Sequence, residues 1–287
     1  MVVILAVEPW WQNPALVVGT SSLGSRQRIA SRRPSLAFGP SEARKMRSEQ
    51  ALSIRSIHRR VPSTSTQRES RLPMTVVRIP QRLDIDTLPR FEGLPLDRIL
   101  TPVTPEQFVQ AVAEITAYAE VGFDTESKPT FKVGELSNGP HLIQFATPEK
   151  AYLFQVGVEG CIEAAKAVLE SDRVLKIGFG LSSDRSRLRS KLGIELRHYL
   201  DLGTTLRYHG KKGQVGLRGA VAAVLAAGLR KSRSVSTSNW ANRSLSEAQQ
   251  HYAANDAYAA LNVFLALDDE AAASLYERIV DRPQRQP

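Results

Sequence analysis

The sequence predicts an α/β protein in which a mixed five-stranded sheet is flanked by helices and preceded by a disordered N-terminal extension. Three observations support this class. From about residue 100 onward, three strand-like segments come first, and strand-like and helical segments then alternate. Residues 1–73 are rich in Ser, Arg and Pro and show no sustained periodicity. The 287 residues suffice for one substantial domain or two small ones.

The individual elements follow from local signals. Thr104 is a predicted helix N-cap, with Pro105 at the first helical position and Gln107 at the third. Pro-Glu-Lys at 148–150 forms a short hairpin turn between two strands. The predicted strands are 121–126, 141–147, 151–156, 174–179 and 198–202. The later predicted helices are 162–170, 182–192 and a helical remainder that ends in an alanine-rich stretch from Ser246 to about Ala273.

The domain boundaries follow the composition. We expect a basic extension at 1–73, a lead-in segment at 74–99, the main domain at 100–275 and a tail at 276–287. Three interpretations of the extension stay open: a disordered tail, a targeting presequence, or a segment absent from the mature protein, with Met74 as the start. The sequence favours a disordered or spurious extension over a targeting segment, and a cytoplasmic location is expected.

Net charge misleads when it is taken over the whole chain. The formal charge is +9, but residues 1–73 hold 12 basic and 4 acidic residues, whereas residues 74–287 hold 26 and 25. The main domain is therefore almost neutral, and nucleic-acid binding must be sought locally. Cys161 is the single cysteine, which excludes a disulfide framework and a cysteine zinc site. The early apolar run, Met1 to Val7, is far shorter than the roughly 20 residues of a membrane span.

Four acidic residues in the predicted strands and helices are candidates for function. Asp124 and Glu126 lie two apart in a strand, so their carboxylates project from one face. Asp184 falls in the first turn of the helix that follows a glycine-containing turn. Asp256 lies four residues after Tyr252, so the two share a helix face. Each signal is weak alone, because a solvated strand end, a helix N-terminus or a structural Tyr–Asp pair would give the same pattern.

Together the four acids indicate metal chemistry. Four carboxylates in one place suit hard divalent cations, Mg²⁺ or Mn²⁺. Two such ions about 4 Å apart can hold the attacking and leaving oxygens of a phosphoryl displacement.

Three motifs carry a resemblance to a known family. The motifs are Phe123-Asp124-Thr125-Glu126; Lys176-Ile177-Gly178-Phe179-Gly180 followed by Asp184; and Ser238-Asn239-Trp240, Arg243, Leu245-Ser246, Gln249, Tyr252-Ala253-Ala254 and Asp256-Ala257. In this order they resemble the tyrosine branch of the DEDD exonuclease superfamily, as in ribonuclease D and Werner exonuclease domains, over about residues 100–270. The resemblance implies a ribonuclease-H-like fold and 3′→5′ exonuclease activity.

The resemblance also implies residue roles. Asp124, Glu126, Asp184 and Asp256 would bind two Mg²⁺ or Mn²⁺ ions, and Tyr252 would orient or help deprotonate the attacking water. The product would be a nucleoside 5′-monophosphate released from a 3′ end.

One departure concerns the position of a histidine. His251 lies five residues before Asp256, which is the spacing of the sibling branch that uses histidine. On a continuous helix that position points about 140° away from Asp256, so Tyr252 is the favoured residue.

The substrate contacts are expected in basic and aromatic positions around these motifs. No acidic residue occurs between Asp201 and Glu247, a stretch with eight basic residues. Such residues bind phosphates without reading sequence, although a solvated helix face is the alternative. The expected contacts to single-stranded DNA or RNA 3′ ends are Arg185, Lys211, Lys212, Arg230 and Lys231, with Phe131 or Phe179 stacking on a base. Trp240 is expected to pack against the last helix.

Three functions remain open from sequence, the third being a different two-metal phosphodiesterase, such as an oligonucleotide-clearing enzyme. The first is an active exonuclease on DNA or RNA ends. The second is a catalytically weak or inactive nucleic-acid-binding or scaffold module on the same fold. The presence of all four acids and Tyr252 favours the first.

Overall fold

The computed structural model describes residues 76–81, 83–130, 138–211 and 213–280, with no side-chain description at 277, 278 and 280. Contacts divide the chain into two units, Met1–Pro62 and Ser63–Pro287, and every described residue belongs to the second. The expected extension at 1–73 and two expected substrate contacts, Phe131 and Lys212, lie outside the described residues.

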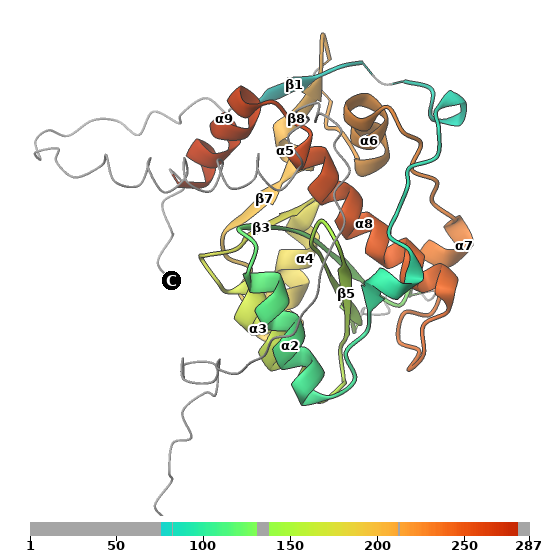
Figure 1. Ribbon diagram of the computed structural model, residues 1–287, viewed down its shortest axis with the longest axis vertical. Helices are drawn as coiled ribbons and strands as arrows, with labels where there is room; N and C mark the ends of the chain where they lie inside the picture. Colours follow the sequence, from blue (N-terminus) through green and yellow to red (C-terminus); the bar gives the residue numbers. More distant parts are fainter. Residues whose placement is uncertain (1–75, 82, 131–137, 212, 281–287) are drawn as a thin grey trace, which may run out of the picture. The chain divides into compact units, whose positions relative to one another are not determined.

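A mixed sheet forms the centre of the fold (Figure 1). Its strand order is β2 (Ile99–Leu100), β5 (Ala151–Gln155), β4 (Leu142–Ala146), β3 (Glu120–Glu126), β6 (Leu175–Gly178) and β7 (Tyr199–Asp201). Strands β3, β4 and β5 form an antiparallel meander, whereas β6 and β7 add in parallel to β3 and β2 adds in parallel to β5. The prediction of a mixed sheet flanked by helices is therefore confirmed, and the two-residue edge strand β2 adds a sixth strand.

Helices cover both faces of this sheet because β3 alternates its side chains. Val121 and Phe123 are buried with α2 (Pro105–Thr116), α3 (Cys161–Leu169) and α4 (Leu181–Arg187). The opposite face of the meander packs on α8 (Glu247–Leu265), through alanines of the helix. Figure 1 shows α2 and α3 side by side and the long helix α8 crossing the sheet.

Side-chain caps mark the starts of α2 and α8, and the cap of α2 was predicted from the sequence. The side chain of Thr104 accepts a hydrogen bond from the Gln107 backbone at 3.4 Å, as expected for the N-cap of α2. Ser246 and Gln249 form a complete capping box at the start of α8. Trp240 is buried against α8, which confirms its expected packing role.

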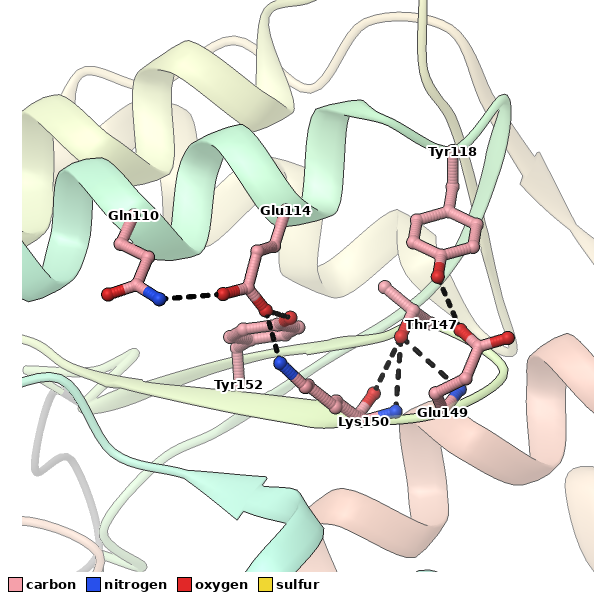
Figure 2. A network of polar contacts seen from close by, with 7 residues as sticks. All are labelled: Gln110, Glu114, Tyr118, Thr147, Glu149, Lys150 and Tyr152. Carbon is pink, nitrogen blue, oxygen red and sulfur yellow. Dashed lines mark hydrogen bonds and ion pairs between the residues drawn. The ribbon is translucent and has the colours of Figure 1, made fainter. Parts of the chain in front are cut away.

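The hairpin between β4 and β5 is tied to α2 by a polar network, shown in Figure 2. Glu114 accepts hydrogen bonds from Lys150 Nζ and the Tyr152 hydroxyl, both at 2.6 Å. Tyr118 donates to Glu149 beside them. Because Ala146 pairs with Gly122, this network lies at the opposite end of β3 from Asp124.

Two predictions after residue 180 are wrong in part. The helix predicted over 182–192 ends as α4 at Arg187 and continues as a π-helical turn, η4 (Leu188–Leu192). The chain after 202 is not wholly helical, because β8 (Leu206–Tyr208) pairs in parallel with β1 (Val77–Ile79). These partners are far apart in sequence, so no local signal reveals the pair. The remaining elements there are α5 (Leu202–Thr205), α6 (Leu217–Leu225) and α7 (Arg233–Ser236), with 3₁₀ turns η2 (Ile85–Thr87) and η3 (Leu96–Arg98) earlier in the chain.

The alanine-rich C-terminal helix is also interrupted. Helix α8 ends at Leu265, and α9 (Asp269–Val280) begins a few residues later, whereas one helix was predicted to about Ala273. Asp268 explains the break, since its Oδ1 accepts a hydrogen bond from the Ala271 backbone at 2.8 Å and caps the new helix. Within the described residues, no helix combines the length and the apolar character needed to cross a membrane.

Candidate active site

Close packing of β3 on α8 brings three acids together. A Cβ atom added at Gly122 would lie 1.9 Å from the carbonyl oxygen of Ala257, so only glycine allows this approach. Asp124 follows Gly122 on the same strand face, and Asp256 precedes Ala257 on the helix. The glycine therefore positions the strand carboxylates against the helix carboxylate.

The three acids form a candidate metal centre. Asp124, Glu126 and Asp256 each offer a carboxylate oxygen, and these oxygens lie within 4.8 Å of one another. Hard carboxylate oxygens at this spacing are suitable ligands for Mg²⁺ or Mn²⁺. The donor set thus fits the cations expected from sequence.

The raised pKa values of these acids also favour a cation site. Burial, followed by the charge of Asp256, raises the pKa of Asp124 well above its ordinary value and that of Glu126 to about 8. Burial likewise raises the pKa of Asp256, against the opposing effect of Lys231. Like charges in a partly buried site repel, and a bound divalent cation would relieve that repulsion.

Asp184 lies beside this group but outside it. It is buried on α4, and its Oδ1 accepts a hydrogen bond of 2.5 Å from Oγ1 of Thr125. Burial raises the pKa of Asp184, and its charge in turn raises the pKa of Asp124. The structure therefore joins Asp184 to the strand that carries two of the other acids, through the residue between them.

A residue that the sequence reasoning missed holds Asp184 in place. Asp201 accepts three backbone hydrogen bonds of 2.9–3.0 Å, from Gly180, Leu181 and Gly203. Gly180 adopts a left-handed conformation, with φ +71°, at the start of α4. Asp201 thereby fixes the turn from which the helix bearing Asp184 begins. Its place at a strand end directly before Leu-Gly is an N-cap signal that could have identified it.

Tyr252 lies one helical turn before Asp256. Its ring is 5.9 Å from the Trp240 ring, and burial together with the charge of Asp256 raises the pKa of Tyr252. Trp240 and Gln249, which donates to the Ser238 hydroxyl at 2.9 Å, fix the segment before α8. His251 is not one of the residues that form the candidate metal centre.

Lys231 reaches into the acidic group, where sequence had suggested a substrate contact. Its Nζ lies 2.6 Å from Oδ2 of Asp256 and 5.4 Å from the centre of the Tyr252 ring. Burial disfavours the lysine charge, but the charge and hydrogen bond of Asp256, together with the charges of Tyr252 and Asp124, raise the pKa of Lys231.

The other expected substrate contacts are more scattered. Lys211 and Arg230 are exposed, and Arg185 lies at a hydrogen-bond distance of 3.4 Å from the Tyr199 hydroxyl. Phe179 is partly buried against a core cluster. Two further basic residues of the acid-free stretch, Arg207 and Arg218, donate to backbone carbonyls and support the fold.

A second residue that sequence reasoning missed is Gln144 on β4. It pairs directly with Asp124 across the sheet and is completely buried. Neither its amide oxygen nor its nitrogen has a hydrogen-bond partner among the described residues. A polar residue inside the apolar segment Leu-Ile-Gln-Phe-Ala is the signal that could have revealed it.

Comparison with known sequences gives relatives that are described as exonucleases. A family model described as 3′–5′ exonuclease matches residues 99–272. The bifunctional 3′–5′ exonuclease/ATP-dependent helicase WRN of Mus musculus is 32% identical over 146 residues, which cover 50% of this chain and 10% of that protein. An exonuclease mut-7 homolog of Aedes aegypti is 30% identical over 189 residues, which cover 58% of this chain and 26% of that protein. The chain thus spans only a minor part of these two relatives.

Solved structures show the same architecture. The Nibbler EXO domain of Aedes aegypti superposes with a TM-score of 0.53 at 26% identity, covering 66% of this chain and 94% of that one. Escherichia coli RNase D gives a TM-score of 0.51 at 21% identity, covering 63% of this chain and 49% of that one. At 21% identity, the second likeness shows the fold alone.

Proposed function

The chain belongs to the 3′–5′ exonuclease family, and from that membership we propose that it is an active, metal-dependent exonuclease. It hydrolyses phosphodiester bonds at the 3′ ends of nucleic acids and releases nucleoside 5′-monophosphates. The observation that carries this proposal is the convergence of Asp124, Glu126 and Asp256, with their ligand oxygens within 4.8 Å of one another.

The metal requirement follows from the donor set. Asp124, Glu126 and Asp256 would hold a divalent cation, Mg²⁺ or Mn²⁺, and Asp184 would complete a site for two ions. When bound, such ions supply an activated water and offset the charge that develops on the phosphate. Thr125 and Asp201 keep Asp184 next to the strand acids.

Tyr252 is proposed to act on the attacking water. It shares a helix face with Asp256, and its raised pKa keeps the phenol protonated near neutral pH. In this role the hydroxyl orients the water by hydrogen bonding, and a carboxylate accepts the proton.

The proposed substrate is a single-stranded 3′ end of DNA or RNA. Exposed Lys211 and Arg230, together with Arg185, offer phosphate contacts that do not read sequence. A structural neighbour, the Trypanosoma brucei RNase D, is described in complex with RNA U12; at 19% identity and a TM-score of 0.50, it shows a shared fold.

A second function is favoured by one specific observation. The ion pair between Lys231 and Asp256 engages one proposed metal ligand at 2.6 Å, as expected of a weak or inactive nucleic-acid-binding module. Retention of all four acids and of Tyr252 favours the active enzyme.

The deciding experiment measures cleavage directly. Single-stranded DNA and RNA oligonucleotides of one sequence, labelled at the 5′ end, are incubated with the protein in Mg²⁺, Mn²⁺ or EDTA. We expect a ladder shortened stepwise from the 3′ end with metal, and none in EDTA or with Asp124→Ala. A circular oligonucleotide of the same sequence should remain intact. Binding without cleavage under every metal condition would support the inactive module, and cleavage that survives EDTA would overturn the metal requirement.

A further inference from the structure

Four buried or partly buried carboxylates face a charge problem whenever no metal is bound. Asp256 is almost fully buried, and its charge acts on Asp124 and Glu126. Such acids repel one another, and the repulsion opposes folding. A positive charge at this place would offset that repulsion when no metal is bound.

Lys231 supplies a positive charge at the site. Its Nζ bonds Oδ2 of Asp256 at 2.6 Å, and its charge opposes the burial that raises the pKa of Asp124 and Glu126. The neighbouring basic residues Arg230 and Arg233 are exposed instead. The contact with Asp256 is therefore specific to Lys231 and is not a general property of the basic stretch.

The backbone that carries Lys231 is firmly anchored. Gly228 donates to the Pro89 carbonyl at 2.7 Å and accepts from the Phe91 backbone at 3.0 Å. A Cβ atom added at Gly228 would come within 2.7 Å of the Ile85 carbonyl oxygen. The next residue, Leu229, is buried. The backbone is thus held in place at Gly228 and Leu229, and Lys231 follows two residues after Leu229.

We propose that Lys231 is a built-in counter-cation that stabilises the metal-free acidic group and competes with a divalent cation for Asp256. This inference rests on the proposed metal-binding function. An ammonium group beside a ligand carboxylate repels an incoming cation, so Lys231 lowers metal affinity while it supports the metal-free fold. It is a positioning residue, which acts through Asp256.

The competition predicts two opposite effects of one substitution. Lys231→Met keeps most of the length of the unbranched side chain and removes its charge. In EDTA, we expect the melting temperature to fall by several degrees, because the acids lose their partner. For Mn²⁺ measured by titration calorimetry, we expect the Kd to tighten by roughly tenfold. A purely structural lysine would lower stability without tightening metal binding.

Matched variants separate charge from position. Arg233→Met removes the same charge from an exposed neighbour and should change neither the Mn²⁺ Kd nor the melting temperature in EDTA. Lys231→Arg keeps the charge and should restore a Kd closer to that of the unaltered protein. Asp124→Asn should weaken Mn²⁺ binding and so identifies the acidic group as the place of binding.

The outcomes also separate this inference from the proposed function. An Mn²⁺ Kd that is unchanged or weaker in Lys231→Met overturns the counter-cation role, even when the unaltered protein cleaves oligonucleotides. An unaltered protein that binds Mn²⁺ but cleaves no oligonucleotide contradicts the proposed activity and leaves the Kd comparison decisive for Lys231. Tighter Mn²⁺ binding together with a lower melting temperature in EDTA supports the inference.

Discussion

The Thr125 hydroxyl donates a 2.5 Å hydrogen bond to Oδ1 of Asp184, and this bond joins strand β3 to helix α4. Thr125 lies between Asp124 and Glu126 and projects from the opposite strand face. Three successive residues of one strand therefore serve the same acidic group, two as proposed ligands and one as the support of a third.

Loss of the Thr125 hydroxyl should loosen Asp184 without emptying the space around it. Thr125→Val keeps the shape but deprives the buried Asp184 carboxylate of its hydroxyl donor, which should lower the free energy of unfolding by about 2 kcal/mol. Nuclease turnover should fall as well, because Asp184 is no longer held. Denaturant unfolding and initial cleavage rates check this. Thr125→Ser retains a donor and should stay near the unaltered protein; equal loss in both variants would contradict the role of the hydroxyl.

Tyr252 and His251 give the sharpest test of the proposed chemistry. Burial and the charges of Asp256 and Glu126 raise the pKa of Tyr252, which places it close to the acids. His251 is not one of the residues that form the candidate metal centre. Tyr252→Phe should lower turnover by about a hundredfold, since it removes the hydroxyl that orients water. His251→Ala should leave turnover within a few-fold. Rates under saturating Mg²⁺ decide between them, and the reverse ranking would assign the role to histidine.

The central part of the fold could be predicted because its signals are local. The strand period placed Asp124 and Glu126 on one face, and helical spacing placed Tyr252 and Asp256 together. Close contact of the two elements depends on Gly122, whose missing side chain admits the Ala257 carbonyl. The prediction identified the small residues on the helix, but not this glycine on the strand.

The features that escaped prediction depend on distant partners. Strand β1 pairs with β8 across more than 120 residues, and neither segment shows a strong strand pattern alone. Asp201 acts through backbone groups of Gly180 and Leu181 in a different turn. Lys231 was identified as basic, but its ion pair with Asp256 joins the segment before α7 to helix α8. Sequence patterns carry no information on such long-range placement.

We expect the buried amide of Gln144 to lower the stability of the folded protein. Its buried amide lacks partners among the described residues, and a buried polar group without partners is unfavourable by about 1–3 kcal/mol. Gln144→Met has a similar shape and should raise the free energy of unfolding by about 1 kcal/mol. We expect turnover to fall, because Gln144 lies directly beside Asp124.

A second glutamine of the same meander provides the control. Gln155 donates through Nε2 to the Asn242 carbonyl at 2.9 Å. Gln155→Met should therefore destabilise the protein, in contrast to Gln144→Met. Denaturant unfolding of both variants measures the difference, and a loss of stability in Gln144→Met would show that its amide is satisfied.

Because of Lys176, we expect the stability of the protein to depend on pH, separately from any effect of the acidic group. This lysine is completely buried in β6, and its Nζ donates to the Ser171 carbonyl at 2.6 Å. Burial lowers the pKa of Lys176 to about 7; nearby Asp172 opposes that shift and Arg197 adds to it. The unfolded chain, with a lysine pKa of about 10.4, binds more protons than the folded chain above pH 7. Stability contributed by this group therefore rises with pH between about 7 and 10.

Replacement by methionine should remove that dependence. Lys176→Met should exceed the unaltered protein in stability most at pH 6, where the buried charge is fully present, and this advantage should shrink by more than about 1 kcal/mol by pH 9. Urea unfolding at pH 6, 7, 8 and 9 follows the difference. Lys191→Met, at an exposed position, serves as the control and should show no such trend. An advantage that is constant or grows with pH would mean that Lys176 remains charged across this range, held by the Ser171 carbonyl and Asp172.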